Sequence, residues 1–309
     1  MYVPTSSNAA ASRQLAYAGL AALVLILIAV DANATDLQQE TIAAFDHYVK
    51  VAQEQFGSTL QPDGPFLWMD SQPESVRASA YRQLRSGHFI IRELQIYDDG
   101  RAIYIPNGMV HHWLGVAFVP GATLKTAEAV LEDYADYSRI YAPQVRRSKI
   151  LARDGDNFRL YLQLYKGSPR EVSYNAYFEV HRQWLSPTRI ASESISTRIA
   201  QLQDASQPDS PDVAAGQDSG YLWRIDDYWR YEQKDGGVYM QVETISLSRD
   251  VPGMLWWFVR PLVHRIARQS IMELLEANRR TIENPREYAP NAFSPQEADS
   301  SSRALPQPR

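Results

Sequence analysis

Two alternating runs joined by an Asp-Gly turn constrain this chain more than any other feature. The runs span residues 220–233 and 238–249, and Asp235-Gly236 lies between them. Asp-Gly is typical of a two-residue β-hairpin turn, because both turn positions need positive φ angles. Val251-Pro252-Gly253 then ends the second run, since proline has no N–H to donate to a strand ladder. The stretch therefore predicts an antiparallel hairpin.

A long helical pattern follows this hairpin. After an aromatic run at 254–259, Pro261 stands where the first turn of a helix tolerates proline. Small and apolar residues recur at helical spacing from Val263 to Ile282, with charged residues between them. Such a helix must pack on another layer, and the preceding sheet is the natural partner. The expected fold class is α+β, with a curved antiparallel sheet wrapped around a long C-terminal helix.

The earlier part of the chain supplies a helical and hairpin extension and the remaining strands. An amphipathic helix is expected over 35–56, a short helix over 74–84 and a hairpin from 89–97 and 102–105. A strand at 111–119 leads into a helix that Thr123 caps. Four strand-like runs follow, at residues 145–152, 158–166, 171–184 and 189–202. A polar loop at 203–219 then precedes the final hairpin.

The two ends of the chain differ from its middle in composition. Residues 15–30 form an apolar run after Arg13, and Ala32-Asn33-Ala34 matches a signal-peptide cleavage pattern. We expect residues 1–34 to be a cleaved export signal, with an uncleaved inner-membrane anchor at 15–30 as the alternative, and the protein to lie in the periplasm or outside the cell. Residues 35–108 form the extension, 109–284 the main domain, and 285–309 a tail whose composition predicts disorder.

Composition excludes several classes of function. The net charge of −5 and the lack of a long basic block argue against a nucleic-acid partner. The chain has no cysteine, which excludes disulfides, thiol catalysis and cysteine-bound metals. His111 and His112 are adjacent, so in a strand they point to opposite faces and cannot bind one metal together. We expect neither a metal nor another cofactor.

The order of strand, helix pair, six-stranded meander and long helix resembles the START-like superfamily of polyketide cyclases and lipid-transport proteins. The stretches that carry the resemblance are 111–123, 133–143, 221–224 and 246–252. The resemblance implies a helix-grip fold over about residues 111–283, within a secreted bacterial subgroup. It further implies a cavity between the sheet and the last helix, where members bind lipids, sterols, hormones or polyketides and a few catalyse reactions.

The hairpin turn defines which residues of the last two strands face one another. With Asp235-Gly236 as the turn, Tyr231 faces Met240, Trp229 faces Val242 and Asp227 faces Thr244. This set is the more apolar one, so we place it toward the helix, together with the alternate residues of 158–164 and 172–180. The candidate ligand-binding residues are Tyr174, Phe178, Arg198, Trp223, Asp227, Trp229, Tyr231 and Met240. The alternative is that these side chains simply fill the core.

Asp227 is the least expected residue of this set. A carboxylate on an apolar face costs several kcal/mol unless it is paired or neutral. Asp227 could anchor a ligand or act as a general acid, or it could form a structural ion pair, for which Arg198 is a candidate. Arg198 ends the polar stripe Ser192, Ser194, Ser196, Arg198, whose direction the pattern leaves open.

Three functions are compatible with these features. The leading hypothesis is binding or transfer of a hydrophobic, lipid-like molecule without catalysis, with transient membrane contact through Trp256, Trp257 and Phe258. These three residues could equally be a core plug. The second hypothesis is an enzyme of the cyclase or dehydratase type that uses Asp227 as acid and base. The third is an interaction module in which residues 35–108 fill the cavity.

Overall fold

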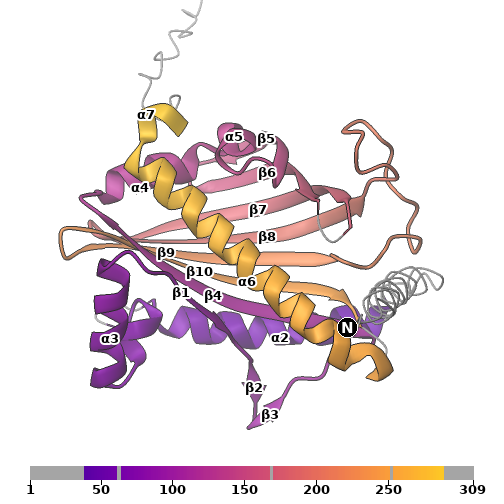
Figure 1. The fold of residues 1–309 in the computed structure, drawn as a ribbon, viewed down its shortest axis with the longest axis horizontal. Coiled ribbons are helices and arrows are strands. Elements are labelled where there is room, and N and C mark those ends of the chain that lie inside the picture. Colours follow the sequence, from indigo (N-terminus) through magenta and orange to yellow (C-terminus); the bar gives the residue numbers. More distant parts are fainter. Residues whose placement is uncertain (1–37, 61–63, 168–169, 251–252, 289–309) are drawn as a thin grey trace, which may run out of the picture.

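One curved antiparallel sheet of eight strands forms the body of the protein. The computed structural model describes residues 38–60, 64–167, 170–250 and 253–288. The strand order is β1-β4-β10-β9-β8-β7-β6-β5, and α6 (Gly253–Glu283) lies across one face of the sheet (Figure 1). The strands are β1 (Ile90–Glu93), β4 (Gly108–Pro120), β5 (Val145–Asp154), β6 (Asn157–Lys166), β7 (Val172–Ser186), β8 (Arg189–Gln201), β9 (Arg224–Lys234) and β10 (Gly237–Arg249).

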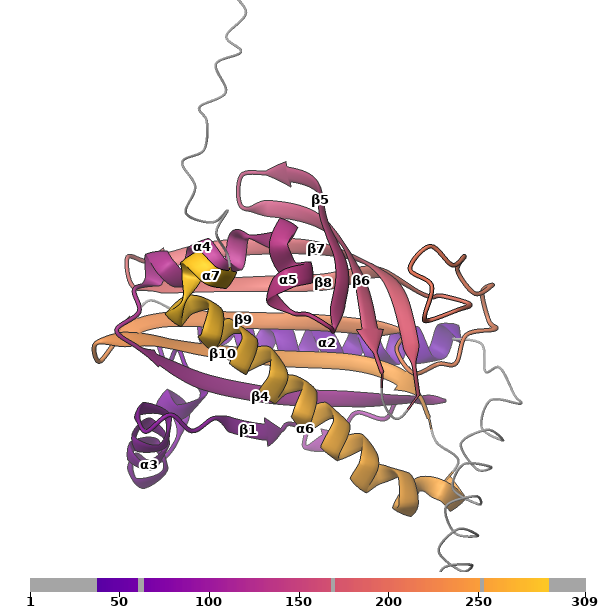
Figure 2. The ribbon, with the colours of Figure 1, turned by 45° about the horizontal axis from the view of Figure 1, so that its top comes forward.

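The chain order explains how the sheet curves around α6. β4 leads through α4 (Leu124–Glu132), a 3-10 turn (Tyr134–Asp136) and α5 (Tyr137–Ile140) to the far edge strand, β5. The meander then returns strand by strand until β10 pairs with β4. Thr123 caps α4 as predicted, with its Oγ1 accepting the N–H of Thr126 at 3.2 Å. Figure 2 shows β5 and β6 bending toward the side on which α6 lies.

The final hairpin has the predicted turn and register. Asp235 and Gly236 have φ angles of 56° and 75°, as a two-residue turn of this kind requires. Met240 pairs with Tyr231, and Thr244 pairs with Asp227. The inner face of the sheet is the face that contacts α6. Its apolar cluster joins Trp229 and Met240 to Ile271 and Leu275 of α6, so the predicted inward set is confirmed.

The long helix begins earlier than the sequence pattern predicted. α6 starts at Gly253, so the aromatic run 254–259 belongs to the helix and Pro261 lies inside it. The prediction took Pro261 as the start because proline removes one helical hydrogen bond, but a long helix can contain such a defect. The side chains of 253–260 lie outside the described part of the structure, and with them the predicted contacts of Trp256, Trp257 and Phe258.

The N-terminal extension packs on the outer face of the sheet, opposite α6. Its helices are α2 (Gln39–Ser58), a 3-10 turn (Trp68–Ser71) and α3 (Glu74–Arg85). Phe45 of α2 packs with Tyr228 and Ile245, whereas Leu84 of α3 packs with Leu114 in a second outer cluster. The helices of residues 38–108 therefore lie on the outer face, whereas Phe89 and Ile91 border the inner cluster, and the interaction-module hypothesis stays a prediction.

Three smaller expectations change in the structure. Residues 90–93 pair with β4 as an added edge strand, and only β2 (Tyr97–Asp98) and β3 (Arg101–Ala102) form the expected hairpin. The loop 203–219 is attached to the outer face, where Arg147 binds Asp209. The expected tail begins with a short helix, α7 (Pro285–Tyr288), and its remainder lies outside the described residues. No helix within the described ranges combines the length and apolar character needed to cross a membrane.

Candidate functional site

Asp227 lies near the middle of the inner face, where β9 runs between β8 and β10. Thr244 stands opposite it on β10, and Ser194 stands opposite it on β8. Thr244 Oγ1 donates a hydrogen bond of 2.6 Å to Asp227 Oδ1. Burial raises the pKa of Asp227 to about 6, while the bond from Thr244 opposes that rise. The carboxylate therefore occupies a deep position with a single described donor.

The two halves of the inner face differ in how completely protein atoms cover them. Tyr231, Met240 and Val242 are fully buried beneath the C-terminal half of α6. Asp227 and Thr244 stay partly accessible, and burial is the main cause that raises the pKa of Asp227. The side chains that share this face and this partial exposure are Leu162, Leu164, Ile199 and Ile225. Partly accessible side chains on the face toward α6 are compatible with space for a ligand between the sheet and the helix.

Polar groups also lie near the helix side of this space. Tyr141, just after α5, donates its hydroxyl to Asn278 Oδ1 of α6 at 3.0 Å. Burial raises the pKa of Tyr141 above its ordinary value, and the nearby carboxylate of Asp227 adds to the rise. The hydroxyl of Tyr231 is buried and has no hydrogen-bond partner among the described residues. The interior thus contains polar atoms whose hydrogen-bonding capacity is not fully used.

A pocket of about 650 Å³ opens at the free end of β4, beside α6. His111 and Trp113 of β4 and His264 of α6 are among the residues that line it. Trp113 also pairs with Thr244, the donor to Asp227. His111 Nε2 lies 2.9 Å from Ser248 Oγ, and burial lowers the pKa of His111 to about 4, so this imidazole is neutral near pH 7. The pocket therefore lies at the edge of the sheet, where Trp113 of the inner cluster meets Tyr48 and Ile105 of the outer cluster.

Six of the eight predicted site residues lie on the inner face. Asp227, Trp229 and Tyr231 of β9 and Met240 of β10 follow from the confirmed hairpin register. Phe178 and Tyr174 of β7 face the inward residues Leu160 and Leu164 of β6. Their assignment to a ligand stays a prediction. Thr244, Tyr141 and Asn278 were not predicted as site residues, although the register placed Thr244 beside Asp227.

The other two predicted site residues, Arg198 and Trp223, lie on the outer face of the sheet. β8 contains a bulge at Thr197, since Ser196 and Arg198 pair with the consecutive residues Phe178 and Tyr177. The extra residue turns Arg198 to the outer face, where it pairs with Asp212, so the expected ion pair with Asp227 is replaced.

Trp223 precedes the first residue of β9, and the strand alternation does not extend to it. Its ring packs in the outer cluster with α2, and its Nε1 donates to Asp218 at 3.0 Å.

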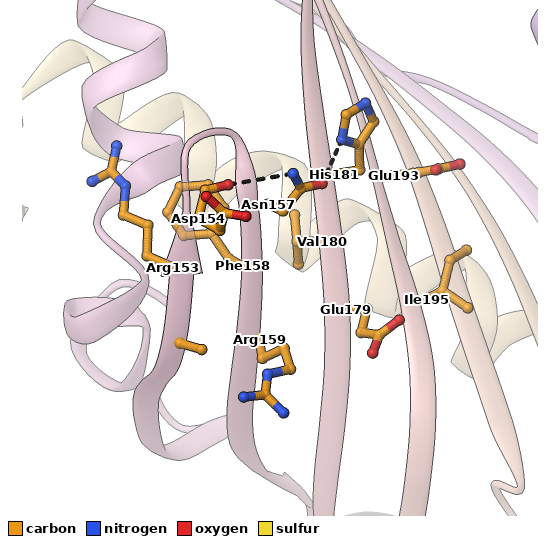
Figure 3. A pocket seen from close by; sticks show the side chains of 11 residues that line it. Arg153, Asp154, Asn157, Phe158, Arg159, Glu179, Val180, His181, Glu193 and Ile195 are labelled. Carbon is orange, nitrogen blue, oxygen red and sulfur yellow. Dashed lines mark hydrogen bonds between the residues drawn. The ribbon is translucent and has the colours of Figure 1, made fainter.

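The outer face carries a second pocket, of about 530 Å³, over β5 to β8 (Figure 3). Charged residues of neighbouring strands line it, and Arg159 of β6 stands opposite Glu179 of β7 in the strand register. His181 Nδ1 lies 2.8 Å from Asn157 Oδ1. Arg159, Glu179 and His181 are exposed, so this pocket is a depression in a solvated surface and contains none of the predicted site residues.

His112 points to the outer face, opposite to its neighbour His111, as strand geometry predicted. Its Nδ1 lies 2.9 Å from the Tyr48 hydroxyl and its Nε2 lies 2.8 Å from Glu243 Oε1. The Tyr48 hydroxyl also accepts the N–H of Ile96 at 3.2 Å. This line of hydrogen bonds joins α2 to β4 and β10, which is a structural role.

Comparisons with known proteins found matches among solved structures and in neither of the other two comparisons. No protein-family model matches the chain, and no curated protein matches it. A fragment of a STAR-related lipid transfer protein from Xanthomonas axonopodis is 16% identical, with a TM-score of 0.40, over 62% of this chain and 98% of that one. Human STARD10 is 11% identical, with a TM-score of 0.41, over 73% of this chain and 87% of that one. The Zhui aromatase/cyclase from Streptomyces sp. R1128 is 15% identical, with a TM-score of 0.38, over 59% of this chain and 98% of that one.

The chain has a START-like, helix-grip fold. The strand order, the helix pair between β4 and β5, and the position of α6 across the inner face define it. The resemblance found in the sequence motifs is thus confirmed at the level of the fold. The secreted bacterial subgroup stays a prediction.

Proposed function

We propose that this protein binds, and in its cell transfers, a hydrophobic lipid-like molecule between the inner face of the sheet and α6. The observation that carries the proposal is the partial accessibility of Asp227, Leu162 and Leu164 on the face of the sheet that lies toward α6. Apolar side chains dominate this region, and a few polar atoms could orient a ligand. The pocket at the end of β4 offers a route of entry.

Native mass spectrometry of the purified full chain tests this function. We expect a mass addition that organic solvent extracts and that corresponds to an apolar molecule. The protein stripped of this molecule should bind it again at one site per chain. A stripped protein that binds no apolar molecule of any head group would overturn the proposal.

An enzyme of the cyclase or dehydratase type is the second candidate. The specific observation in its favour is a carboxyl whose pKa of about 6 suits proton transfer near neutral pH. Once the ligand is identified, product analysis separates the two functions. Turnover that Asp227→Asn abolishes, with ligand binding retained, would support catalysis.

We further propose that the protein acts after export, with residues 1–34 removed. The apolar run at 15–30 and the Ala32-Asn33-Ala34 pattern support this location. The intact mass of the protein recovered from a bacterial host tests it. A chain that retains residues 1–34 in the membrane fraction would instead favour the anchor.

A further inference from the structure

The inner carboxylate has no cationic partner within the described part of the chain. Asp227 receives one hydrogen bond there, from Thr244, and forms no ion pair. The adjacent Asp226 on the outer face differs, because the backbone N–H of Ser196 binds it at 3.1 Å and the guanidinium of Arg224 lies at 3.7 Å. A carboxylate away from bulk water is costly unless a cation or several donors accompany it. Asp227 is thus the group on the inner face whose charge the described residues leave least compensated.

Several aromatic residues share the inner face with Asp227. Trp229 lies two residues further along the same face of β9, and its ring stacks on Tyr231 at 5.6 Å. Trp113 lies on the same face of β4, opposite Thr244, and Tyr141 lies close enough for Asp227 to raise its pKa. The faces of such rings attract cations, and tryptophan does so most strongly. A carboxylate among aromatic rings is a suitable environment for an ammonium group.

The pocket at the edge of the sheet has acidic residues in its lining. The pocket at the end of β4 is lined by the carboxylates Glu93 and Asp250 and contains neither lysine nor arginine among its described residues. His264 lies 3.4 Å from Glu93, and the other histidine, His111, is neutral because burial lowers its pKa. No described lysine or arginine of this lining would therefore oppose the entry of a cation by this route.

We propose that the ligand is a lipophilic amine, whose ammonium group binds Asp227 and whose hydrocarbon part lies along the apolar inner face. The proposal rests on the proposed function and adds the chemical class of the head group. The ammonium would donate to the free oxygen of Asp227 and lie against Trp229 and Trp113. The hydrocarbon chain would cover Leu162, Leu164 and Ile225, which are otherwise partly accessible.

Three probes with the same chain and different head groups test this inference. Dodecylamine, dodecanol and dodecanoate are titrated into the stripped full chain at about pH 8, below their micelle concentrations, and tryptophan fluorescence reports binding. At that pH the amine is cationic and Asp227 is ionised. We expect dodecylamine to bind at least about tenfold more tightly than dodecanol, and dodecanoate to bind most weakly, since a hydrogen-bonded charge pair contributes about 1.5–3 kcal/mol.

Two variants assign the preference to Asp227. Asp227→Asn should lower the affinity for dodecylamine at least about tenfold and change the affinity for dodecanol by less than about twofold. Asp226→Asn is the matched control, because it removes the neighbouring carboxylate, whose hydrogen bonds and ion pair lie with Ser196 and Arg224, and it should change each affinity by less than about twofold. If Asp226→Asn does not fold, Asp46→Asn on the exposed side of α2 replaces it.

The outcomes separate this inference from the proposed function. Equal binding of dodecylamine and dodecanol to the unmodified protein would overturn the amine inference and leave apolar binding intact. Binding of none of the three probes would count against both. If Asp227→Asn does not fold, the order of the three probes on the unmodified protein decides the inference by itself.

Discussion

Asp226 and Asp227 are sequence neighbours on β9 that face opposite sides of the sheet. Burial raises the pKa of each to about 6, and in both cases hydrogen bonds to the carboxylate oppose that rise. For Asp226 the guanidinium of Arg224 opposes it further. For Asp227, the hydroxyl of Thr244 is the one described group that lowers the pKa against the effect of burial. At the scale of single residues, this adjacent pair therefore differs in its partners, because Asp226 has the cation Arg224 nearby and Asp227 has no described cation.

The raised pKa of Asp227 predicts a pH dependence of stability. Its folded-state pKa, about 6, exceeds its unfolded value of 3.8, so the folded state binds the proton more tightly. Ionisation therefore destabilises the stripped protein above about pH 6, and this penalty is absent below about pH 4. Asp227→Asn should gain stability relative to the unmodified protein at about pH 8, by on the order of 1–3 kcal/mol more than at about pH 4.

Urea unfolding at the two pH values measures this difference. The asparagine oxygen still accepts the bond from Thr244, so the comparison isolates the charge. A stability difference that is the same at both values, or larger in acid, would contradict the assigned burial of Asp227.

At the scale of elements, α6 approaches β4 closely because Gly115 has no side chain. A Cβ at that position would lie 2.5 Å from Ile271 Cγ2 and 2.9 Å from Leu275 Cδ1 of α6. Such distances require one of the two elements to move. The small residue thus brings the C-terminal half of α6 onto the sheet, while Asp227 on the same face stays partly accessible.

Gly115→Ala should therefore destabilise the protein by about 1–3 kcal/mol, because overpacking displaces α6 from β4. Gly57→Ala is the matched control, since Gly57 lies within α2, has no atom within 4 Å of an added Cβ and should gain from alanine's helix propensity. Thermal or urea unfolding measures both. Equal effects of the two substitutions would show that the contact between Gly115 and α6 is not close.

At the scale of the whole molecule, the sheet separates two layers with different roles. α2 and α3 close the outer face with apolar clusters, and α6 lies over the inner face that carries the candidate site (Figures 1 and 2). Among the described residues, α2 and α3 contribute no side chain to the inner apolar cluster that contains Phe178 and Ile225. Stability and ligand binding should therefore respond separately to substitutions in the two layers.

Phe45→Ala tests this separation. Phe45 is fully buried between α2 and the outer face, so its truncation should cost about 3–5 kcal/mol of unfolding free energy. Below the unfolding transition, the affinity for dodecanol should stay within about twofold, because the inner face is intact. Val76→Ala, at an exposed position of α3, is the control and should change neither quantity. Loss of affinity in folded Phe45→Ala would show that the layers are coupled.

Local patterns predicted much of this fold. The Asp-Gly turn sets the register of β9 and β10, and a register with period two decides which side chains share a face. The position of Asp227 beside Thr244 and Trp229 followed from this rule alone. The Thr123 cap and the four strands of the meander also followed from short-range signals.

The sequence by itself thus determined the strands, the hairpin register and the presence of a carboxylate on the inner face, because these depend on turn geometry and on alternation within one segment. The tertiary structure alone decided that Arg198 turns outward at the Thr197 bulge, that residues 38–108 place their helices on the outer face, and that Tyr141 and Asn278 meet near Asp227. These features depend on how surfaces distant in the chain fit together, and one extra residue in a strand is enough to reverse a face.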